Sequence, residues 1–328
     1  MNTTRIHSIL VILLLQSLAA RGDIYGLWIP NGLDITTEGN SHSARPFNFR
    51  NTTNFTTYDG PIHYQQVYAG SQFTNVPGGG EYIVAVSLRT DCSFSSGFSV
   101  TTHFEVRAST TSKAPDELSP ILQENVGSDE VVTFQTNSFG FGHVYPGSCP
   151  QTHALDQYIP FGIPFLYDPA KGNLLIDIRH SGFKTEHGSS NADAQNTIGD
   201  GISRIAAFSL TAATADIVDT EGLVTVFTLK PTPSLTITIQ TNNLDLVWPT
   251  DPDVFRLEWA QLLGEKIAWQ EYTNTIRRDD VIKELKIPLT SNFLKAPKYF
   301  RLFWNSPQPG IPGSAIQALG SENSTPSN

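Results

Sequence analysis

Apolar and polar residues alternate with a period of two along much of residues 81–304, and no long stretch carries the stripe of an amphipathic helix. One run places Leu174, Ile176 and Ile178 on one side of a strand, with residues 175, 177 and 179 on the other. Clusters rich in Gly and Pro separate such runs as turns. The pattern predicts an all-β protein with a single helical turn near 114–123.

Two other runs carry specific expectations. The apolar set Phe98, Val100, Thr102, Phe104 and Val106 is expected to share one face of one strand. Residues 223–229 are apolar on both alternating sets, which is typical of a strand buried on both faces, so this strand should be central in its sheet.

Pro231 and Pro233 mark a boundary, because two prolines spaced by one residue do not fit a central strand and stiffen a connection. We expect a β-sandwich over 23–230, a linker at 231–233 and a smaller β-sandwich over 234–305. Residues 306–328 are rich in Pro, Gly, Ser and Asn and have little to bury, so we expect a disordered tail.

The first 22 residues have the pattern of a secretory signal peptide. Arg5 and His7 precede a short apolar run at 9–15, and small residues follow it. Cleavage is expected after Gly22, with cleavage after Ala19 as the alternative. No second apolar run of about 20 residues follows, so the mature chain should have no transmembrane segment and should be secreted or held at the cell surface.

Charge and cysteine content narrow the function classes. Acidic residues number 31 against 21 Lys and Arg, and such a surface disfavours nucleic acid and anionic lipid as partners. The two cysteines, Cys92 and Cys149, are expected to form a disulfide in an oxidising compartment, with two buried free thiols as the alternative. A zinc site is disfavoured because neither cysteine belongs to a CxxC pair.

The sequence resembles a jelly-roll-like domain of unassigned function in secreted or surface-sorted bacterial proteins, as in Verrucomicrobia, Planctomycetes and cyanobacteria. The segments that carry the resemblance are 64–68, 71–73, 83–88, 114–119, 125–127, 165–169 and 172–179, which together span most of 60–230. The C-terminal unit resembles immunoglobulin- or fibronectin-III-like modules at 247–249, 255–258, 269 and 299–302. The resemblance implies a fold and an extracellular location but no catalytic residue.

Enzymatic chemistry would need carboxylates, or a nucleophile and its base, at one concave site. The acidic candidates for an extracellular polysaccharide-degrading enzyme are Asp177, Glu186, Asp193 and Asp200, near His180 and His187. A salt bridge between Asp177 and Arg179 on one strand face is the simpler interpretation and is favoured. We therefore expect no catalytic residues.

A Gly-rich segment, 182–201, carries Asp193 and Asp200, whose oxygens could hold a calcium ion. The segment lacks the spacing of an EF-hand loop, so a solvated loop with no cofactor is favoured. For ligand binding we single out Trp28, Tyr64, Tyr68, Asp177 and Arg179; His63 could line the same groove. Tyr64 and Tyr68 could instead form cross-strand pairs.

Together these features predict a secreted, non-enzymatic protein that serves in binding or in surface display at the cell exterior. Carbohydrate, in the form of an extracellular polysaccharide, is the expected partner on fold analogy. The alternatives are a polysaccharide-degrading exoenzyme and a structural component of an extracellular matrix.

Overall fold

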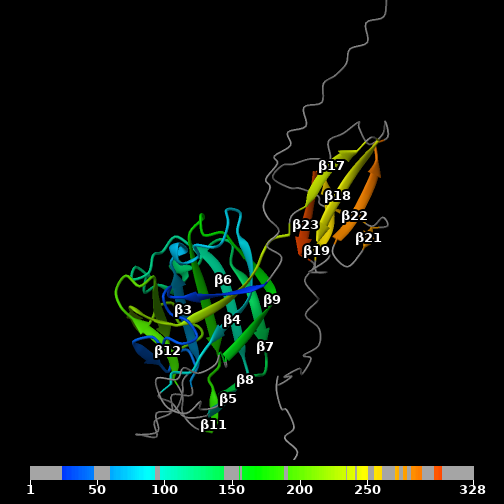
Figure 1. Ribbon diagram of the computed structural model, residues 1–328. Helices are drawn as coiled ribbons and strands as arrows, with labels where there is room; N and C mark the ends of the chain where they lie inside the picture. The colour runs from blue at the N-terminus through cyan, green and yellow to red at the C-terminus, as the bar shows by residue number, and fades with distance from the viewer. Residues whose placement is uncertain are drawn as a thin grey trace, which may run out of the picture.

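The computed structural model describes residues 24–47, 60–92, 97–143, 155, 157–187, 191–233, 235–240, 242–249, 255–260, 270–272, 276–278, 282–289 and 299–304. Its regular structure consists of β-strands and two short 3-10 helices, η1 (Gly70–Gln72) and η2 (Leu122–Asn125). All the strand pairs in these ranges are antiparallel. The predicted all-β class is confirmed, in a sandwich-like arrangement (Figure 1).

The N-terminal part is built on two large sheets. The first sheet has four strands in the order β1 (Tyr25–Ile29), β16 (Thr225–Lys230), β4 (Glu81–Leu88) and β9 (Gln157–Tyr167). The second has six in the order β14 (Ile217–Asp219), β13 (Ile202–Ala207), β3 (Ile62–Tyr68), β10 (Asn173–His180), β6 (Phe104–Thr111) and β7 (Val131–Thr136).

Two three-stranded sheets accompany them. One has the order β11 (Lys184–His187), β5 (Gly97–Thr101) and β8 (Phe139–His143). The other has the order β15 (Glu221–Leu223), β12 (Ala192–Asn196) and β2 (Ser41–Ser43).

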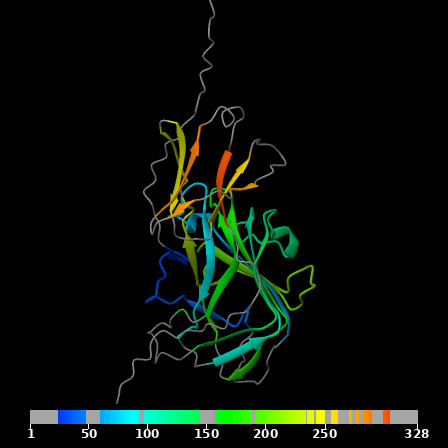
Figure 2. The same ribbon diagram turned by 90° about the vertical axis from the view of Figure 1, so that its right-hand side faces the viewer.

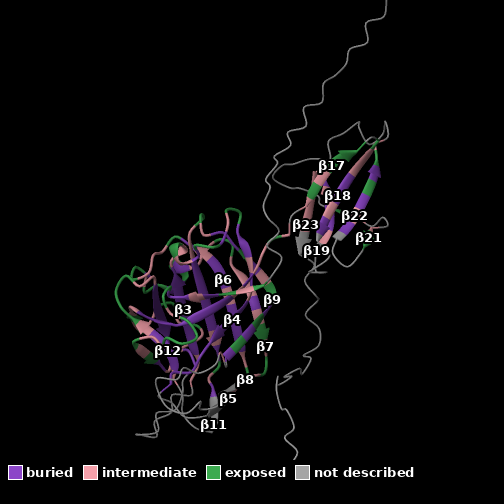
Figure 3. Cartoon of the chain, viewed as in Figure 1, coloured by how far each residue is buried: buried purple, intermediate pink, exposed green. Residues whose placement is uncertain are grey.

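The main hydrophobic core lies between the two large sheets. The strands β3, β4, β10, β13 and β16 are buried along most of their length (Figure 3). Tyr68 of β3 joins them directly: its ring lies edge-on to Phe227 of β16 with the ring centroids 4.8 Å apart, and its hydroxyl lies 2.9 Å from the Thr225 Oγ1. The expectation of a central strand is confirmed for residues 225–229, since β16 lies between β1 and β4 with both faces largely buried, whereas Leu223 belongs to β15 of another sheet.

A smaller cluster covers part of the other face of the six-stranded sheet. Three adjacent strands contribute Val67, Leu175 and Ile205 to it. These side chains pack against Leu118, in the segment that leads into η2, and against Leu122 of η2. Figure 2 shows this segment at one side of the sheet, as the teal ribbon at the right. Beside this cover, strands β3, β10 and β6 carry polar side chains on the same face.

Two local predictions were wrong. Residues 98–106 form two strands in different sheets, because the chain turns at Thr102 and His103, where Thr101 Oγ1 donates to the His103 carbonyl oxygen. The helical turn expected near 114–123 lies instead at η2, since Asp116 adopts a positive φ of 65°, which a right-handed helix does not allow.

The C-terminal part has its own hydrophobic cluster, built around Leu246, Trp248, Leu257, Leu285 and Ile287. Its strands form two sheets. Their orders are β17 (Thr236–Gln240), β18 (Asn243–Pro249), β22 (Ile282–Pro288), β21 (Arg277–Arg278), and β20 (Gln270–Glu271), β19 (Phe255–Ala260), β23 (Tyr299–Trp304).

Several sequence predictions fall wholly or partly outside the described residues. The signal peptide at 1–22 and the tail at 306–328 lie outside them. Cys149 also lies outside them, so the disulfide stays a prediction. Cys92 itself is buried, and the described part of the chain contains no free cysteine. Over the ranges the structure describes, we find no helix with the length and hydrophobicity that a bilayer crossing requires.

His180 at the end of β10 should make stability depend on pH. Its side chain is fully buried, its Nε2 contacts the Pro46 carbonyl oxygen and its Nδ1 accepts from the Gly182 N–H. Burial lowers the His180 pKa from 6.5 to about 4, so the unfolded chain binds this proton more tightly than the folded one. Stability should therefore fall as the pH drops from about 6.5 to about 4, by up to about 3 kcal/mol.

Urea unfolding of the wild type and of His180→Asn across this pH range measures the effect. The variant should be less stable at neutral pH and should lack this part of the pH dependence. Parallel curves for the two proteins would contradict the prediction.

Candidate functional site

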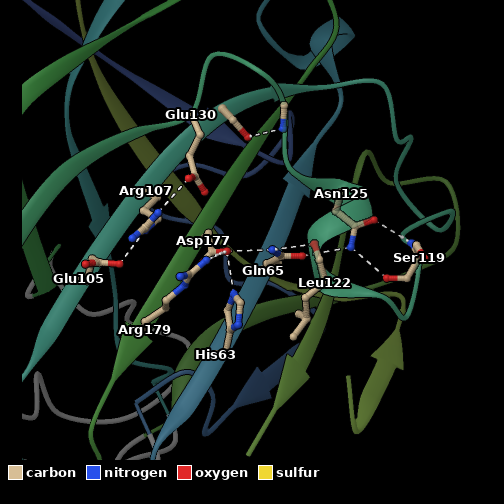
Figure 4. A network of polar contacts seen from close by, with 12 residues as sticks. His63, Gln65, Glu105, Arg107, Ser119, Leu122, Asn125, Glu130, Asp177 and Arg179 are labelled. Atoms are coloured by element: carbon tan, nitrogen blue, oxygen red, sulfur yellow. Dashed lines mark hydrogen bonds and ion pairs between the residues drawn. The ribbon is translucent and has the colours of Figure 1, made fainter. Parts of the chain in front are cut away.

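Polar side chains gather on the outer face of the six-stranded sheet, around β10. Strand register explains why they meet: Asp177 lies opposite Gln65 of β3 and Arg107 of β6, and Arg179 lies opposite His63 and Glu105. Directly opposed residues share a sheet face, so these side chains are neighbours. We call the set His63, Gln65, Glu105, Arg107, Glu130, Asp177 and Arg179 the polar face (Figure 4).

Asp177 is the centre of the polar face. Its carboxylate lies 2.7 Å from the His63 Nε2 and accepts from the Gln65 Nε2 at 2.8 Å and the Arg179 Nε at 2.8 Å. Burial by itself raises the Asp177 pKa, but the hydrogen bonds from His63 and Arg179 more than offset it, and the pKa is lowered overall. Asp177 is therefore a carboxylate at neutral pH and is unsuited to be a proton donor.

Gln65 connects this centre to the cover over the sheet. Its amide nitrogen also donates to the Leu122 carbonyl oxygen in η2, and its oxygen accepts from the Asn125 amide. Asn125 in turn binds the backbone of Ser119 through both of its side-chain polar atoms (Figure 4). The segment 119–125 is thus anchored to the same hydrogen-bond network as Asp177.

A second ion-pair group lies on the neighbouring strand. Arg107 of β6 donates from Nε to Glu105 at 2.6 Å and from Nη1 to Glu130 at 2.8 Å. About a quarter of the Arg107 side chain is exposed, as is 22% of the Arg179 side chain. Within the described residues, the Arg107 Nη2 and the Arg179 Nη1 have no hydrogen-bond partner, so each guanidinium keeps one nitrogen free for a ligand.

His63 has an unfilled hydrogen-bonding position. Its side chain is 7% exposed, and its Nδ1 is buried with no partner in the described part of the chain. Buried polar atoms are nearly always hydrogen-bonded, so an orphan at a polar surface cluster indicates a place for a bound hydroxyl or water.

The structure separates the five predicted ligand-binding residues. Asp177 and Arg179 lie together on the polar face. Tyr64 and Tyr68, at 1% and 3% exposure, point to the opposite side of β3 into the core. Their assignment to a groove is wrong, because the period of two that brings His63 and Gln65 outward turns the tyrosines inward.

Trp28 lies on β1 of the other large sheet, away from the polar face. It is half-buried, and the Arg89 guanidinium lies over its ring, 5.1 Å from the centroid. This cation–π contact occupies one face of the indole.

Asp193, one of the two predicted calcium ligands, is fully buried in an ion pair. Arg89 binds its carboxylate at 2.6 and 2.7 Å and also donates to the carbonyl oxygens of Asp34 and Thr37. The Gly39 N–H donates to the other Asp193 oxygen at 2.9 Å. Arg89 and Asp193 together fasten segment 34–39 to the sandwich, and the guanidinium already supplies the positive charge that a cation would bring.

The second predicted ligand, Asp200, belongs to a different environment. It accepts backbone N–H groups from Thr197 and Ile202, which shapes its own turn. In the part of the chain that the structure describes, the ligand-type side chains close enough to share an ion are Glu38, Asp91 and Cys92, and neither predicted residue is among them. The structure therefore does not bring Asp193 and Asp200 together as a calcium site.

Glu38 lies next to this ion pair, and the pKa of its carboxyl group is strongly raised. Burial, and then the negative charge of Asp193, raise its pKa from 4.5 to about 7. Its Oε2 accepts from the Cys92 N–H, while its Oε1 is buried without a partner among the described residues. Because Cys92 is not a free thiol, the group offers a cation two carboxylates at most.

The carboxylates on the polar face do not form a catalytic pair. Glu105 and Glu130 share the face with Asp177, but each of the three is ion-paired to an arginine. The side chains of Glu186 and His187 lie outside the described residues, and His180 is buried in the core. On the polar face, an arginine therefore holds each of the three carboxylates.

Sequence reasoning missed Glu105, Arg107 and Arg89. Glu105 and Arg107 alternate with Val106 and Ala108 on one strand, so their outward direction was readable. Their nearness to Asp177 depends on the pairing of β6 with β10, which lie more than 60 residues apart in the chain. That register has no local signal.

The chain matches no protein-family model, no curated protein and no solved structure at a similarity that indicates a relationship. The resemblance to jelly-roll-like and immunoglobulin-like domains therefore stays a prediction.

Replacing Arg89 should strongly destabilise the fold. Arg89→Met leaves the Asp193 carboxylate buried without its counter-charge, and breaking such a pair costs about 3–5 kcal/mol. Lys171→Met is the matched control: Lys171 is 70% exposed, lies 3.7 Å from Asp168 in the same part of the chain, and should change stability by less than about 0.5 kcal/mol. Urea unfolding measures both, and equal effects of the two variants would contradict the prediction.

Glu38→Gln should stabilise the protein more at pH 8 than at pH 5. The raised pKa means that the folded chain binds this proton more tightly than the unfolded chain, so wild-type stability falls as the pH rises from about 4.5 to about 7. Glutamine removes that loss, by roughly 1 kcal/mol after discounting for the partial exposure of the side chain. Urea unfolding at the two pH values measures the change, and a pH-independent difference would contradict it.

Proposed function

We propose that the chain is a secreted, non-enzymatic protein that binds carbohydrate at the cell exterior through the polar face. The supporting observation is a set of ion-paired, partly exposed guanidinium groups on a sheet face, with free nitrogens beside carboxylate oxygens. Sugar hydroxyls both donate and accept hydrogen bonds, so they suit such a surface. The strands and the ion pairs hold these groups in place before a ligand arrives, which lowers the entropic cost of binding.

The finer architecture is part of the same proposal. We propose that residues 1–22 are removed as a signal peptide, that 23–230 form a jelly-roll-like sandwich and that 234–305 form an immunoglobulin- or fibronectin-III-like module. A Cys92–Cys149 disulfide would suit the oxidising destination. Buried Cys92, with no free thiol in the described residues, supports that pairing.

The proposal that the protein is not an enzyme rests on the protonation and pairing of its carboxyl groups. A general acid needs a pKa near the working pH, and Asp177 has a lowered pKa and is bound by three side chains. Glu38 has a pKa of about 7, but it lies beside the Arg89–Asp193 pair rather than on the polar face.

The test is a pull-down of residues 23–328 on insoluble polysaccharides, with calcium and with a chelator, while the supernatant is assayed for released sugar. We expect retention without sugar release on at least one polysaccharide. Release would favour the exoenzyme alternative, and no retention on any polymer would favour a structural role in a matrix.

Two variants locate the site. Arg107→Ala should weaken retention about tenfold, because a hydrogen bond from a charged group contributes about 1.5 kcal/mol or more. Arg277→Ala, whose side chain is 80% exposed in the C-terminal part, is the control and should bind like the wild type. Circular dichroism and thermal unfolding should show that both variants fold. Equal retention of the two variants would show that binding occurs elsewhere.

A further inference from the structure

The polar face has a charge balance that selects among carbohydrates. Three carboxylates, those of Glu105, Glu130 and Asp177, face two guanidinium groups, those of Arg107 and Arg179. With His63 neutral, the cluster therefore has one excess negative charge, on a chain whose formal charge is −10. An anionic sugar would meet net repulsion here, since each guanidinium is already paired.

The free hydrogen-bonding atoms of the polar face alternate in type. The ion pairs occupy one oxygen each of Glu105 and Glu130, and leave Glu105 Oε2 and Glu130 Oε1 as acceptors with no partner in the described residues. None of these oxygens is buried, and the free nitrogens of Arg107 and Arg179 lie on the adjoining positions of the same face. A hydroxyl can accept from such a nitrogen and donate to such an oxygen.

His63 supplies an independent observation that favours a ligand with hydroxyl groups. Its Nδ1 is buried and has no partner among the described residues, and its ring lies beside Asp177 and Arg179 within the polar face (Figure 4). A neutral hydroxyl can fill this position without the desolvation cost of a charged group.

Building on the proposed carbohydrate binding, we infer that the polar face binds neutral, polyhydroxylated sugar chains and discriminates against uronate-bearing or sulfated ones. Hydroxyls of the sugar bridge the arginine nitrogens and the glutamate oxygens. A sugar carboxylate that accepts from the same nitrogens would lie beside the carboxylates of Glu105 and Glu130, which repel it, and it has no proton to donate to their oxygens.

The experiment compares polymers that share a backbone and differ in charge. Polygalacturonate and its fully methyl-esterified form are one pair, and carboxymethyl cellulose and cellulose are another. Each polymer is added as a competitor to the full mature chain bound to the polysaccharide that retains it, and the protein released is measured. We expect the neutral member of a pair to compete at least about tenfold better than the acidic one. Equal or better competition by the acidic member overturns this inference but leaves carbohydrate binding standing, whereas no retention on any polysaccharide overturns both.

Glu105→Gln tests the charge argument directly. The variant removes the excess negative charge from the polar face, and competition by acidic polymers should improve severalfold relative to wild type. Glu271→Gln, an exposed glutamate of the C-terminal part, is the matched control and should leave the preference unchanged. An unchanged preference in Glu105→Gln overturns the inference.

A measurement on the wild type keeps the test open if Glu105→Gln does not fold. Binding of a neutral chain through hydroxyls should change little between low and high salt, because it neutralises no charge on the ligand. Binding that weakens steeply as salt rises would indicate an anionic ligand and would overturn the inference.

Discussion

The pairing of β3 with β10 in the middle of the six-stranded sheet is the constraint on which the rest of the molecule depends. Its register sets Tyr64 opposite Ile178 on the inner side and Gln65 opposite Asp177 on the outer side. A slip of one residue would turn a histidine and a glutamine into the aromatic core and expose the tyrosines. The core and the polar face are therefore two sides of one register, and neither could be altered without the other.

Buried or partly buried arginine–carboxylate pairs are the second recurring feature. Arg89 with Asp193 fastens segment 34–39, Arg204 with Glu221 ties β13 to β15, and Arg179 with Asp177 organises the polar face. Such pairs add little net stability over apolar packing, but removing one partner is costly, because the other charge stays buried. They are best understood as devices that hold loops and strand edges in one arrangement. In the polar face the same device keeps hydrogen-bonding groups in place while leaving their outer atoms free.

The proposed binding function rests on the protonation and ion pairing of these groups rather than on their residue types. Aspartate, glutamate and histidine side chains on one sheet face would suit a hydrolase if one carboxyl group were held protonated. Here hydrogen bonds to Asp177 lower its pKa, and arginines pair with its neighbours. What remains is a fixed pattern of donors and acceptors, and the proposed recognition of a ligand rests on it.

The sequence by itself determined the all-β class, the central position of residues 225–229 and the side of β10 on which Asp177 and Arg179 lie. These follow from the period of two, which is a property of neighbouring residues. It did not determine that Tyr64 lies inside while His63 lies outside, since both alternating sets of residues on β3 contain large side chains with polar atoms. Nor did it show that Glu105, Arg107 and Asp177 meet, or that Arg89 neutralises Asp193 across about a hundred residues. Only the tertiary structure decided those contacts, because long-range strand register is set by the packing of whole sheets, and a local stretch of sequence carries no record of its distant partner.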